Sequence, residues 1–222
     1  ESQEKFPQVD VYVGGVEHAT RHLIYGRFWH KFLYDLGLVK SIEPFVRLET
    51  VGLVLGEGGV KMSKRLGNVI NPDDVIREHG SDVARMYVMF MGPFGQTGVW
   101  DSKSIVGVKR FLERVERLKA KIGNSCKNEN IIHQTVKKVA EDVEGFKFNT
   151  AISSMMVLLN ELESNGLSQS EYDKFMSILS IFAPEMCKDY VEEIWPEYDE
   201  TKLTANEVVI AIQVNGKLRG EV

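Results

Sequence analysis

The chain has 222 residues, 43% of them hydrophobic and 27% charged, with a formal net charge of −5. This length allows one large domain or two modest ones, and the composition is that of a globular protein. The acidic balance counts only mildly against a nucleic-acid binder, because local stripes of Lys and Arg matter more than the sum. No apolar run approaches the roughly 20 residues that cross a bilayer, so we expect no membrane partner.

The two cysteines, Cys126 and Cys187, have no CxxC spacing. They indicate neither a disulfide framework nor a cysteine zinc site, and we expect two reduced thiols in a cytoplasmic protein. The N-terminal residues Glu-Ser-Gln-Glu-Lys lack the apolar stretch of a signal peptide.

The first region has the pattern of an α/β unit. Residues 9–13, Val-Asp-Val-Tyr-Val, predict a buried strand that ends at Gly14–Gly15. A helix is expected over residues 17–36, because apolar residues fall four apart along one side: Ile24, Phe28, Phe32 and Leu36. A second strand is expected at residues 50–55, and the order strand, turn, helix, strand predicts a parallel sheet.

A Gly-rich basic segment follows at residues 56–68, here called the lysine loop. Asn71-Pro72-Asp73-Asp74 then predicts the start of a short helix, with proline in its first turn and acids at its positive end. Gly80 ends this helix, and Ser81 is expected to cap the next one.

Residues 101–200 predict a bundle of antiparallel helices. In residues 101–122 apolar side chains fall three and four apart: Ile105, Val108, Leu112, Val115, Leu118 and Ile122. Further amphipathic segments cover residues 132–146 and 152–159, and Ala183–Pro184 predicts a last helix that ends near Trp195–Pro196. The final segment, residues 207–222, alternates apolar and polar residues around Asn215–Gly216, a strong hairpin signal. A lone hairpin is marginal in water, so we expect the chain to stop inside a small β-containing domain.

The lysine loop carries the clearest chemistry. Lys61 and Lys64 place two ammonium groups three residues apart beside Gly58, Gly59 and Gly67. Such groups can neutralise the charge that builds up as pyrophosphate leaves a nucleotide. The loop is not a Walker P-loop, because Met62 follows the lysine and the GxxxxGK spacing is absent. Without other motifs, a Lys-rich loop is more often a solvated surface turn.

The other motifs give this loop a context. Lys-Met-Ser-Lys-Arg at residues 61–65 resembles the KMSKS signature of class I aminoacyl-tRNA synthetases. Residues 9–19 and 26–37 look like the corresponding segments of leucyl-tRNA synthetases. Residues 148–153, Phe-Asn-Thr-Ala-Ile-Ser, are similar to a helix of their tRNA-binding bundle, and residues 213–220, Gln-Val-Asn-Gly-Lys-Leu-Arg-Gly, to the segment leading into their C-terminal domain. The resemblance covers nearly the whole chain.

The resemblance implies a fold and a reaction. The expected fold class is α/β followed by all-α: the second half of a Rossmann-like sheet (residues 1–56), the lysine loop and connector helices (57–100), a class Ia anticodon-binding-type bundle (101–205) and a β-hairpin stub (206–222). The complete enzyme would form leucyl-adenylate from leucine and ATP with Mg²⁺, then transfer leucine to tRNA(Leu). No tightly bound cofactor is implied.

The resemblance also implies site residues. Lys61 and Lys64 would contact the ATP phosphates, with Met62 and Ser63 holding the loop near the nucleotide. The adenylate pocket would be lined by four residues after the first strand, Gly14, Gly15, Glu17 and His18, with Glu17 accepting hydrogen bonds from ribose hydroxyls. His22 would border the amino acid. A strand end followed by a helix start is a common nucleotide site.

Several residues have other interpretations. Glu17, His18 and His22 have a spacing that suits zinc, with His30 as the nearest further ligand, but we expect no metal. His22 and His30 could be ordinary helix histidines. A basic stripe of Arg110, Arg114, Arg117 and Lys121 would contact tRNA phosphates; it could also be a solvated face, since Glu113 and Glu116 lie between its members.

The sequence departs from the family pattern in ways that limit the expected activity. It contains neither the HIGH signature nor any sign of the editing domain, so we expect the chain to need the upstream half and to activate little leucine alone. Arg65 replaces the usual Ser, and Glu116 a usual Trp. Glu185-Met186-Cys187-Lys188 departs from the usual His-Ile-Ala-Glu, which puts tRNA contacts there in doubt. Two alternatives stay open: a class I enzyme for valine, isoleucine or methionine, and a non-catalytic tRNA-binding module.

Overall fold

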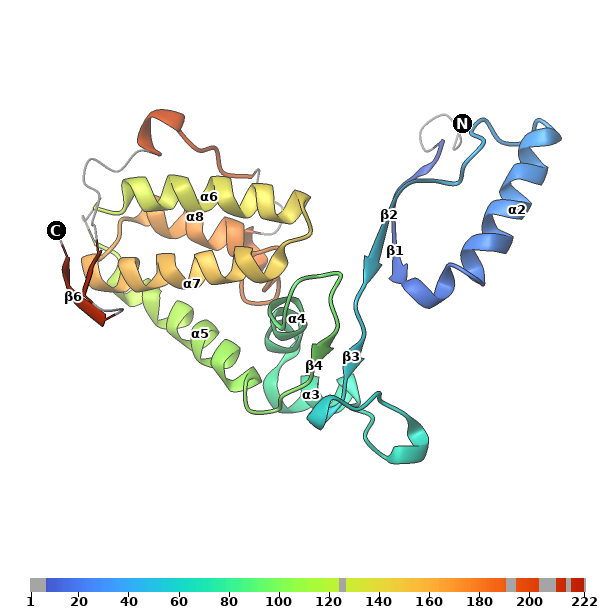
Figure 1. Ribbon diagram of the computed structural model, residues 1–222. Coiled ribbons are helices and arrows are strands. Elements are labelled where there is room, and N and C mark those ends of the chain that lie inside the picture. Colours follow the sequence, from blue (N-terminus) through green and yellow to red (C-terminus); the bar gives the residue numbers. More distant parts are fainter. Residues whose placement is uncertain (1–6, 124–126, 191–194, 204–210, 215–216, 222) are drawn as a thin grey trace. The chain divides into compact units, whose positions relative to one another are not determined.

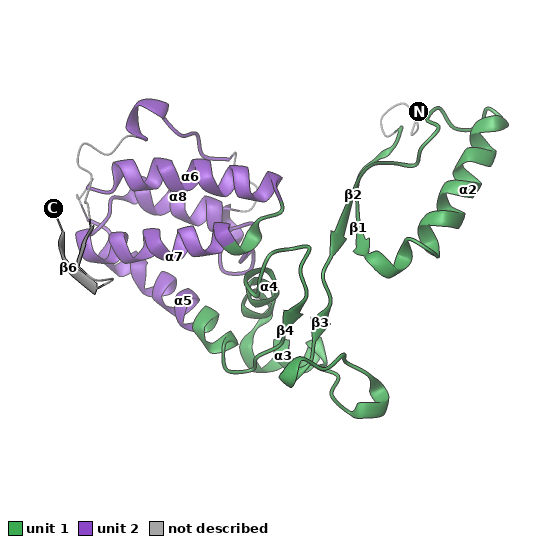
Figure 2. Ribbon diagram, in the orientation of Figure 1, with its two compact units in different colours: residues 1–109, 146–149 green, residues 110–145, 150–222 purple. Residues whose placement is uncertain are grey.

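The computed structural model describes residues 7–123, 127–190, 195–203, 211–214 and 217–221 (Figure 1). The chain divides into two compact units (Figure 2). Unit 1 comprises residues 1–109 and 146–149, and unit 2 comprises residues 110–145 and 150–222.

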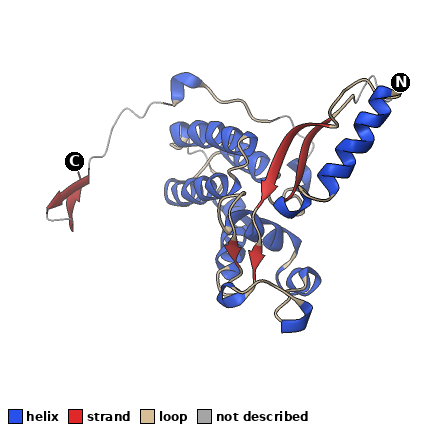
Figure 3. Ribbon diagram, turned by 45° about the vertical axis from the view of Figure 1, so that its right-hand side comes forward, coloured by secondary structure: helices blue, strands red, loops and turns tan. Residues whose placement is uncertain are grey.

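Unit 1 begins with two long parallel strands. Strand β1 (Val9–Gly15) pairs with β2 (Phe45–Val51) in a register that runs from Val9 opposite Phe45 to Gly15 opposite Val51. The connection contains a 3₁₀ turn (Val16–His18) and helix α2 (His22–Asp35), which lies beside the strands (Figure 3). The predicted order of strand, glycine turn, helix and parallel strand is therefore confirmed. The prediction that the first strand is buried is wrong, because Val9, Val11 and Val13 are exposed.

Helix α2 starts later than the apolar spacing predicts. Arg21 has φ −127° and ψ −94°, outside the helical region, so the 3₁₀ turn and the helix are separate elements. The predicted apolar side of the helix is present, but its side chains are exposed: Ile24 is 61% exposed and Phe28 is 63% exposed. Within the described residues, no residue of α2 is buried.

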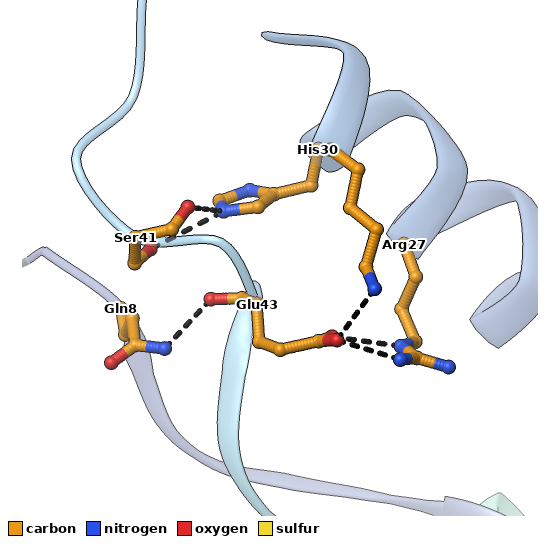
Figure 4. A network of polar contacts seen from close by, with 6 residues as sticks. Gln8, Arg27, His30, Ser41 and Glu43 are labelled. Atoms are coloured by element: carbon orange, nitrogen blue, oxygen red, sulfur yellow. Dashed lines mark hydrogen bonds and ion pairs between the residues drawn. The ribbon is translucent and has the colours of Figure 1, made fainter. Parts of the chain in front are cut away.

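Polar contacts hold α2 to the segment that enters β2 (Figure 4). Arg27 donates from Nε and Nη2 to the two carboxylate oxygens of Glu43, at 2.8 and 2.6 Å, and Lys31 Nζ lies 2.8 Å from the same carboxylate. Their hydrogen bonds lower the pKa of Glu43 to about 2. His30 Nε2 lies 2.8 Å from the carbonyl oxygen of Ser41. These contacts fix the helix where apolar packing does not.

The strand predicted at residues 50–55 is two strands in two sheets. Strand β2 ends at Val51, and β3 (Val54–Leu55) pairs in parallel with β4 (Gly98–Val99). Gly52 separates them, because its N–H donates to the carbonyl of Phe94 at 3.0 Å and a Cβ at this position would overlap the Gln96 carbonyl. Glycine inside a strand pattern often marks such a close backbone approach.

Helices α3 (Pro72–His79) and α4 (Ser81–Phe90) follow the lysine loop. Asn71 caps α3, as its position before proline suggests, by accepting from the N–H of Asp73 at 3.1 Å. The prediction that Ser81 caps α4 is wrong: the cap is Gly80, whose φ of +93° suits glycine. The core of unit 1 contains Val83, Met86, Tyr87 and Trp100.

Residues 146–149 belong to unit 1, and two of their aromatic side chains pack within it. Phe94 packs against Phe146 and Phe148, with ring centroids 5.1 and 5.5 Å away. The Arg47 guanidinium lies 5.1 Å from the Phe146 ring centroid, within the range of a cation–π contact.

Unit 2 is helical, as predicted. Its helices are α5 (Ile105–Leu118, with its first turn in unit 1), α6 (Glu129–Glu144), α7 (Phe148–Asn165) and α8 (Gln169–Leu179). A 3₁₀ turn (Lys119–Lys121) extends α5, and α6 packs against α8 (Figure 1). Most of the predicted apolar residues are buried, including Val115, Leu118, Val136 and Val139. Ile122, the last member predicted for the first helix, lies after the helical residues and is half-buried. Helix α8 was not specifically predicted.

The last helix predicted after Ala183–Pro184 is wrong for the residues described. Residues 184–187 form turns, and only a short 3₁₀ helix follows (Lys188–Tyr190). Residues 191–194 lie outside the described part of the chain. A further 3₁₀ helix spans Glu200–Lys202. Residues 185–187, where the sequence put tRNA contacts in doubt, therefore lie in turns and not in an α-helix.

At the C-terminal end, β5 (Ala211–Val214) pairs antiparallel with β6 (Lys217–Glu221), and the register shifts between Ile212 and Gln213. Asn215–Gly216, the predicted turn, lies outside the described residues, as does Cys126. Cys187 is buried. Among the described residues, no helix has both the length and the hydropathy needed to cross a bilayer.

Candidate functional site

The lysine loop lies between β3 and α3. Gly58 and Gly59 turn the chain with φ of +78° and +76°, a region open chiefly to glycine. The chain then returns to β3, where Lys61 forms an isolated antiparallel bridge with Leu55, and the Gly56 N–H donates to the carbonyl of Val60 at 2.8 Å. The first lysine is therefore fixed to the end of a strand through its backbone.

The second half of the loop is a short 3₁₀ helix, Lys64–Leu66. Ser63 caps it, since Ser63 Oγ accepts from the N–H of Leu66 at 3.3 Å. Gly67 ends it in the left-handed conformation, with φ of +64°. Ser63 and Gly67 therefore fix the ends of the short helix, and with them the position of the Lys64 backbone from which its side chain extends.

Asn68, which sequence reasoning did not single out, links the two halves. Asn68 Oδ1 accepts from the Ser63 N–H at 2.9 Å, and Nδ2 donates to the Lys61 carbonyl at 3.2 Å. Its position three residues after Arg65 gives no periodic or charge signal. The available hints were its place in the run Leu-Gly-Asn-Val, which resembles the continuation of the family signature, and its position beside Gly67, because such side chains often bond to nearby backbone groups.

The side chains of Lys61 and Lys64 are exposed, whereas Met62 and Ser63 are half-buried. Among the described residues, neither ammonium group has an ion-pair partner. Two ammonium groups on a fixed turn, neither of them paired with a carboxylate in the described residues, can attract and hold a polyanion such as a nucleoside triphosphate.

The second group of predicted site residues lies where β1 ends. Gly14 and Gly15 are the last residues of the strand, opposite Thr50 and Val51 of β2. Glu17 and His18 follow on the exposed 3₁₀ turn. The Glu17 carboxylate folds back over Gly15, because a Cβ on Gly15 would overlap both of its oxygens. An exposed carboxylate thus stands at the carboxyl end of parallel strands, the usual position of ligands in α/β sheets.

His22, the first residue of α2, joins this group through Tyr12 of β1. Tyr12 Oη lies 2.7 Å from His22 Nδ1, and the two rings stack with centroids 5.5 Å apart. The His22 ring is therefore oriented by a strand residue. Among the described residues, no hydrogen bond or ion pair joins this group to the lysine loop, although both lie in unit 1. No three His, Cys, Asp or Glu side chains are grouped as metal ligands in the described part of the chain.

The basic stripe lies on α5 and the turn that follows. Arg110, Arg117 and Lys121 are exposed, but Arg114 is half-buried and bonds to Glu163 and Asn160 of α7. Lys121 Nζ donates to the carbonyl of Glu163 at 3.3 Å. Two members of the stripe therefore have partners within the bundle.

Comparisons with known proteins give matches along the chain. The family model described as tRNA synthetases class I (I, L, M and V) matches residues 1–101, and the model described as the anticodon-binding domain of tRNA ligase matches residues 129–222. A similar solved structure is the Agrobacterium radiobacter K84 agnB2 LeuRS, crystallised as a ternary complex with tRNA and LeuAMS. It is 33% identical, with a TM-score of 0.82 over 96% of this chain and 32% of that chain.

A second similar structure is the Mycobacterium tuberculosis methionyl-tRNA synthetase bound by methionyl-adenylate. It is 15% identical, with a TM-score of 0.61 over 82% of this chain and 43% of that chain, and at this identity it supports the fold alone. The present chain thus spans about a third of the length of the LeuRS and less than half that of the methionyl enzyme.

Proposed function

The chain belongs to the class I aminoacyl-tRNA synthetases, and from this premise we propose that it is part of a leucine–tRNA ligase. In this proposal it supplies one side of the ATP site and helices that bind tRNA(Leu). The observation that carries the proposal is the lysine loop, which holds Lys61 and Lys64 on a capped turn with both ammonium groups exposed. The identity to the LeuRS, 33%, favours leucine over the other amino acids of the family model.

The proposed reaction begins with the formation of leucyl-adenylate. A carboxylate oxygen of leucine attacks the α-phosphorus of ATP, and the bond to the bridging oxygen breaks as pyrophosphate leaves. Lys61 and Lys64 would stabilise the negative charge that moves onto the departing phosphates, an effect that is strongest in the transition state. Mg²⁺ accompanies ATP as part of the substrate. Ser63 caps the turn that carries Lys64, and Met62 would help to hold the loop near the nucleotide.

The end of β1 would receive the nucleoside part of the adenylate. Gly14 and Gly15 end the strand, and the exposed Glu17 carboxylate beside Gly15 can accept hydrogen bonds from ribose hydroxyls. His18 would lie beside it. His22, oriented by Tyr12, would border the leucine side chain.

Leucine activation in this proposal requires a second polypeptide segment that carries the HIGH signature, because the 222 residues contain no such sequence. The apolar side of α2 supports this requirement, since Ile24 and Phe28 are more than half exposed. A contiguous apolar surface of this kind is typical of an interface. Two strands alone are also too few for a stable sheet.

Transfer to tRNA would use unit 2. Of the basic stripe, Arg110 and Arg117 are the members best placed for phosphate contact, because both are exposed and neither is paired with a carboxylate in the described part of the chain. The match of residues 129–222 to an anticodon-binding domain supports a tRNA-binding role for α6, α7 and α8, the helices that follow α5.

Leucine-dependent ATP–pyrophosphate exchange tests the proposal. The chain is assayed alone and mixed with a polypeptide carrying the HIGH-bearing half, with leucine, valine, isoleucine or methionine as the amino acid. We expect exchange only in the mixture and only with leucine. Exchange with another of these amino acids would assign the chain to a sibling enzyme. No exchange in a mixture of folded, associated polypeptides would favour a non-catalytic tRNA-binding module.

A further inference from the structure

We propose that Asn68 is a positioning residue for the two lysines, holding the lysine loop in the shape that binds the ATP phosphates. The inference rests on the proposed function and deepens it, because it names a residue that acts on ATP only through Lys61 and Lys64.

Both polar atoms of the Asn68 side-chain amide form hydrogen bonds. Its Oδ1 accepts from the Ser63 N–H at 2.9 Å and its Nδ2 donates to the Lys61 carbonyl at 3.2 Å. A backbone N–H can only donate and a carbonyl can only accept, so this pair of partners fixes the orientation of the amide. One side chain therefore joins the backbone on both sides of Met62.

These two hydrogen bonds fix the backbone positions from which the two lysine side chains extend. Lys61 is itself one partner, and Lys64 directly follows the other. The 3₁₀ helix that carries Lys64 has only three residues, too few to hold its own direction. A lysine side chain is long and flexible, so the position of its Cα atom limits the positions that its ammonium group can reach. Fixing both origins before ATP arrives reduces the ordering needed on binding.

Gly56 lies directly beside Asn68. Gly56 is buried, and a Cβ there would lie 3.2 Å from both Asn68 Nδ2 and the Asn68 carbonyl oxygen. Its backbone is extended, with φ of −68° and ψ of 175°, which alanine adopts without strain. Gly56→Ala therefore crowds the side chain and the backbone carbonyl of Asn68 without removing the amide or straining the backbone angles of residue 56. It offers an independent way to disturb the same contact.

The first test measures the loop without any substrate. Lys61, Lys64 and Arg65 are trypsin sites, so limited proteolysis of the full chain, read by mass spectrometry, reports how often the loop opens. We expect Asn68→Ala to raise the cleavage rate after these residues about tenfold, as expected from the loss of two hydrogen bonds. Asn68→Asp, which keeps only the acceptor for Ser63, and Gly56→Ala should give intermediate rates.

Asn71→Ala is the matched control, because Asn71 lies three residues further on but caps α3 instead of bridging the loop. It should leave loop cleavage at the wild-type rate. Equal cleavage of Asn68→Ala and wild type, with equal thermal unfolding midpoints, would overturn the proposal. If Asn68→Ala does not fold, the comparison of Asn68→Asp and Gly56→Ala with wild type decides in the same way.

The second test measures pyrophosphate exchange in the mixture described above. We expect Asn68→Ala to lower kcat/KM for ATP about tenfold while KM for leucine stays unchanged. Faster loop cleavage without any change in the ATP parameters would overturn the positioning role. If the wild-type mixture shows no exchange, the proposed function fails, whereas the cleavage rates still decide whether Asn68 holds the loop.

Discussion

Arg114 of α5 and Glu163 of α7 form an ion pair between two helices of unit 2. Arg114 Nε donates to Glu163 Oε2 at 3.1 Å, and its Nη2 donates to the same oxygen and to Asn160 Oδ1, the latter at 2.7 Å. The guanidinium lowers the pKa of Glu163 below its usual range. A side chain that the sequence suggested as a tRNA contact therefore has a structural role as well.

Replacing either member of this pair should destabilise unit 2. We expect Arg114→Ala and Glu163→Ala each to lower the free energy of unfolding by about 1 kcal/mol, since both side chains are partly shielded from water. The double variant should cost little more than either single one, because both remove the same interaction. Urea unfolding followed by circular dichroism measures these values, and strict additivity would show that the two residues do not interact.

Arg110 and Arg117 should carry the phosphate contacts of the basic stripe. The double variant Arg110→Glu/Arg117→Glu should weaken tRNA binding and flatten its dependence on salt, because fewer counterions are released. Lys109→Glu is the control on the same helix but off the stripe, and it makes the charge change of one of the two substitutions. Binding is measured by filter retention at several salt concentrations. An unchanged slope in the double variant would make the stripe a solvated face.

Gly52 should tolerate no side chain. A Cβ at Gly52 would overlap the backbone carbonyl of Gln96, which cannot move as a flexible side chain can. Gly52→Ala should therefore lower the free energy of unfolding of unit 1 by about 2 kcal/mol or more. Gly92→Ala is the control, since nothing lies within 4 Å of its Cβ position. Thermal unfolding of the two variants compares them, and equal midpoints would contradict this account of the break between β2 and β3.

The Glu43 carboxylate should titrate far below a free glutamate. Its pKa is lowered to about 2, chiefly by the hydrogen bond from Arg27 and next by that from Lys31. A lowered pKa in the folded state contributes stability above the ordinary value of 4.5, and this contribution is lost as the pH falls from 4.5 through about 2. NMR titration of the side-chain carboxyl carbon measures the midpoint. Arg27→Ala should move it upward, and a midpoint near 4.5 in the wild type would show that the ion pair is absent in solution.

The sequence predicted elements whose signals are local. Asn71 before Pro72 marked the start of α3, and the spacing of Val115 and Leu118 marked a buried helix face; both predictions are confirmed. Helix α8 had an equally local signal, Ser168 three residues before Glu171. These two form a capping box in the structure, so this helix could have been predicted.

Other features depend on residues that are distant in the sequence. The break at Gly52 requires the Gln96 backbone, and the partners of Arg114 lie on another helix. Asn68 is close to the residues it holds, yet its two bonds depend on the exact path of the loop between Lys61 and Ser63. Periodicity and motif spacing report which residue types are present, but not which backbone groups a side chain reaches.

In the proposed function Lys64 acts on the phosphates of ATP, and one substitution tests this role most directly. Leucine-dependent pyrophosphate exchange is measured in the reconstituted mixture with Lys64→Ala, and with Arg65→Ala as the control for the neighbouring charge. Loss of an electrostatic contact made in the transition state should lower the rate of Lys64→Ala roughly 100-fold, whereas Arg65→Ala should stay close to wild type. Equal rates for Lys64→Ala and wild type would contradict the assignment of the lysine loop to the ATP site.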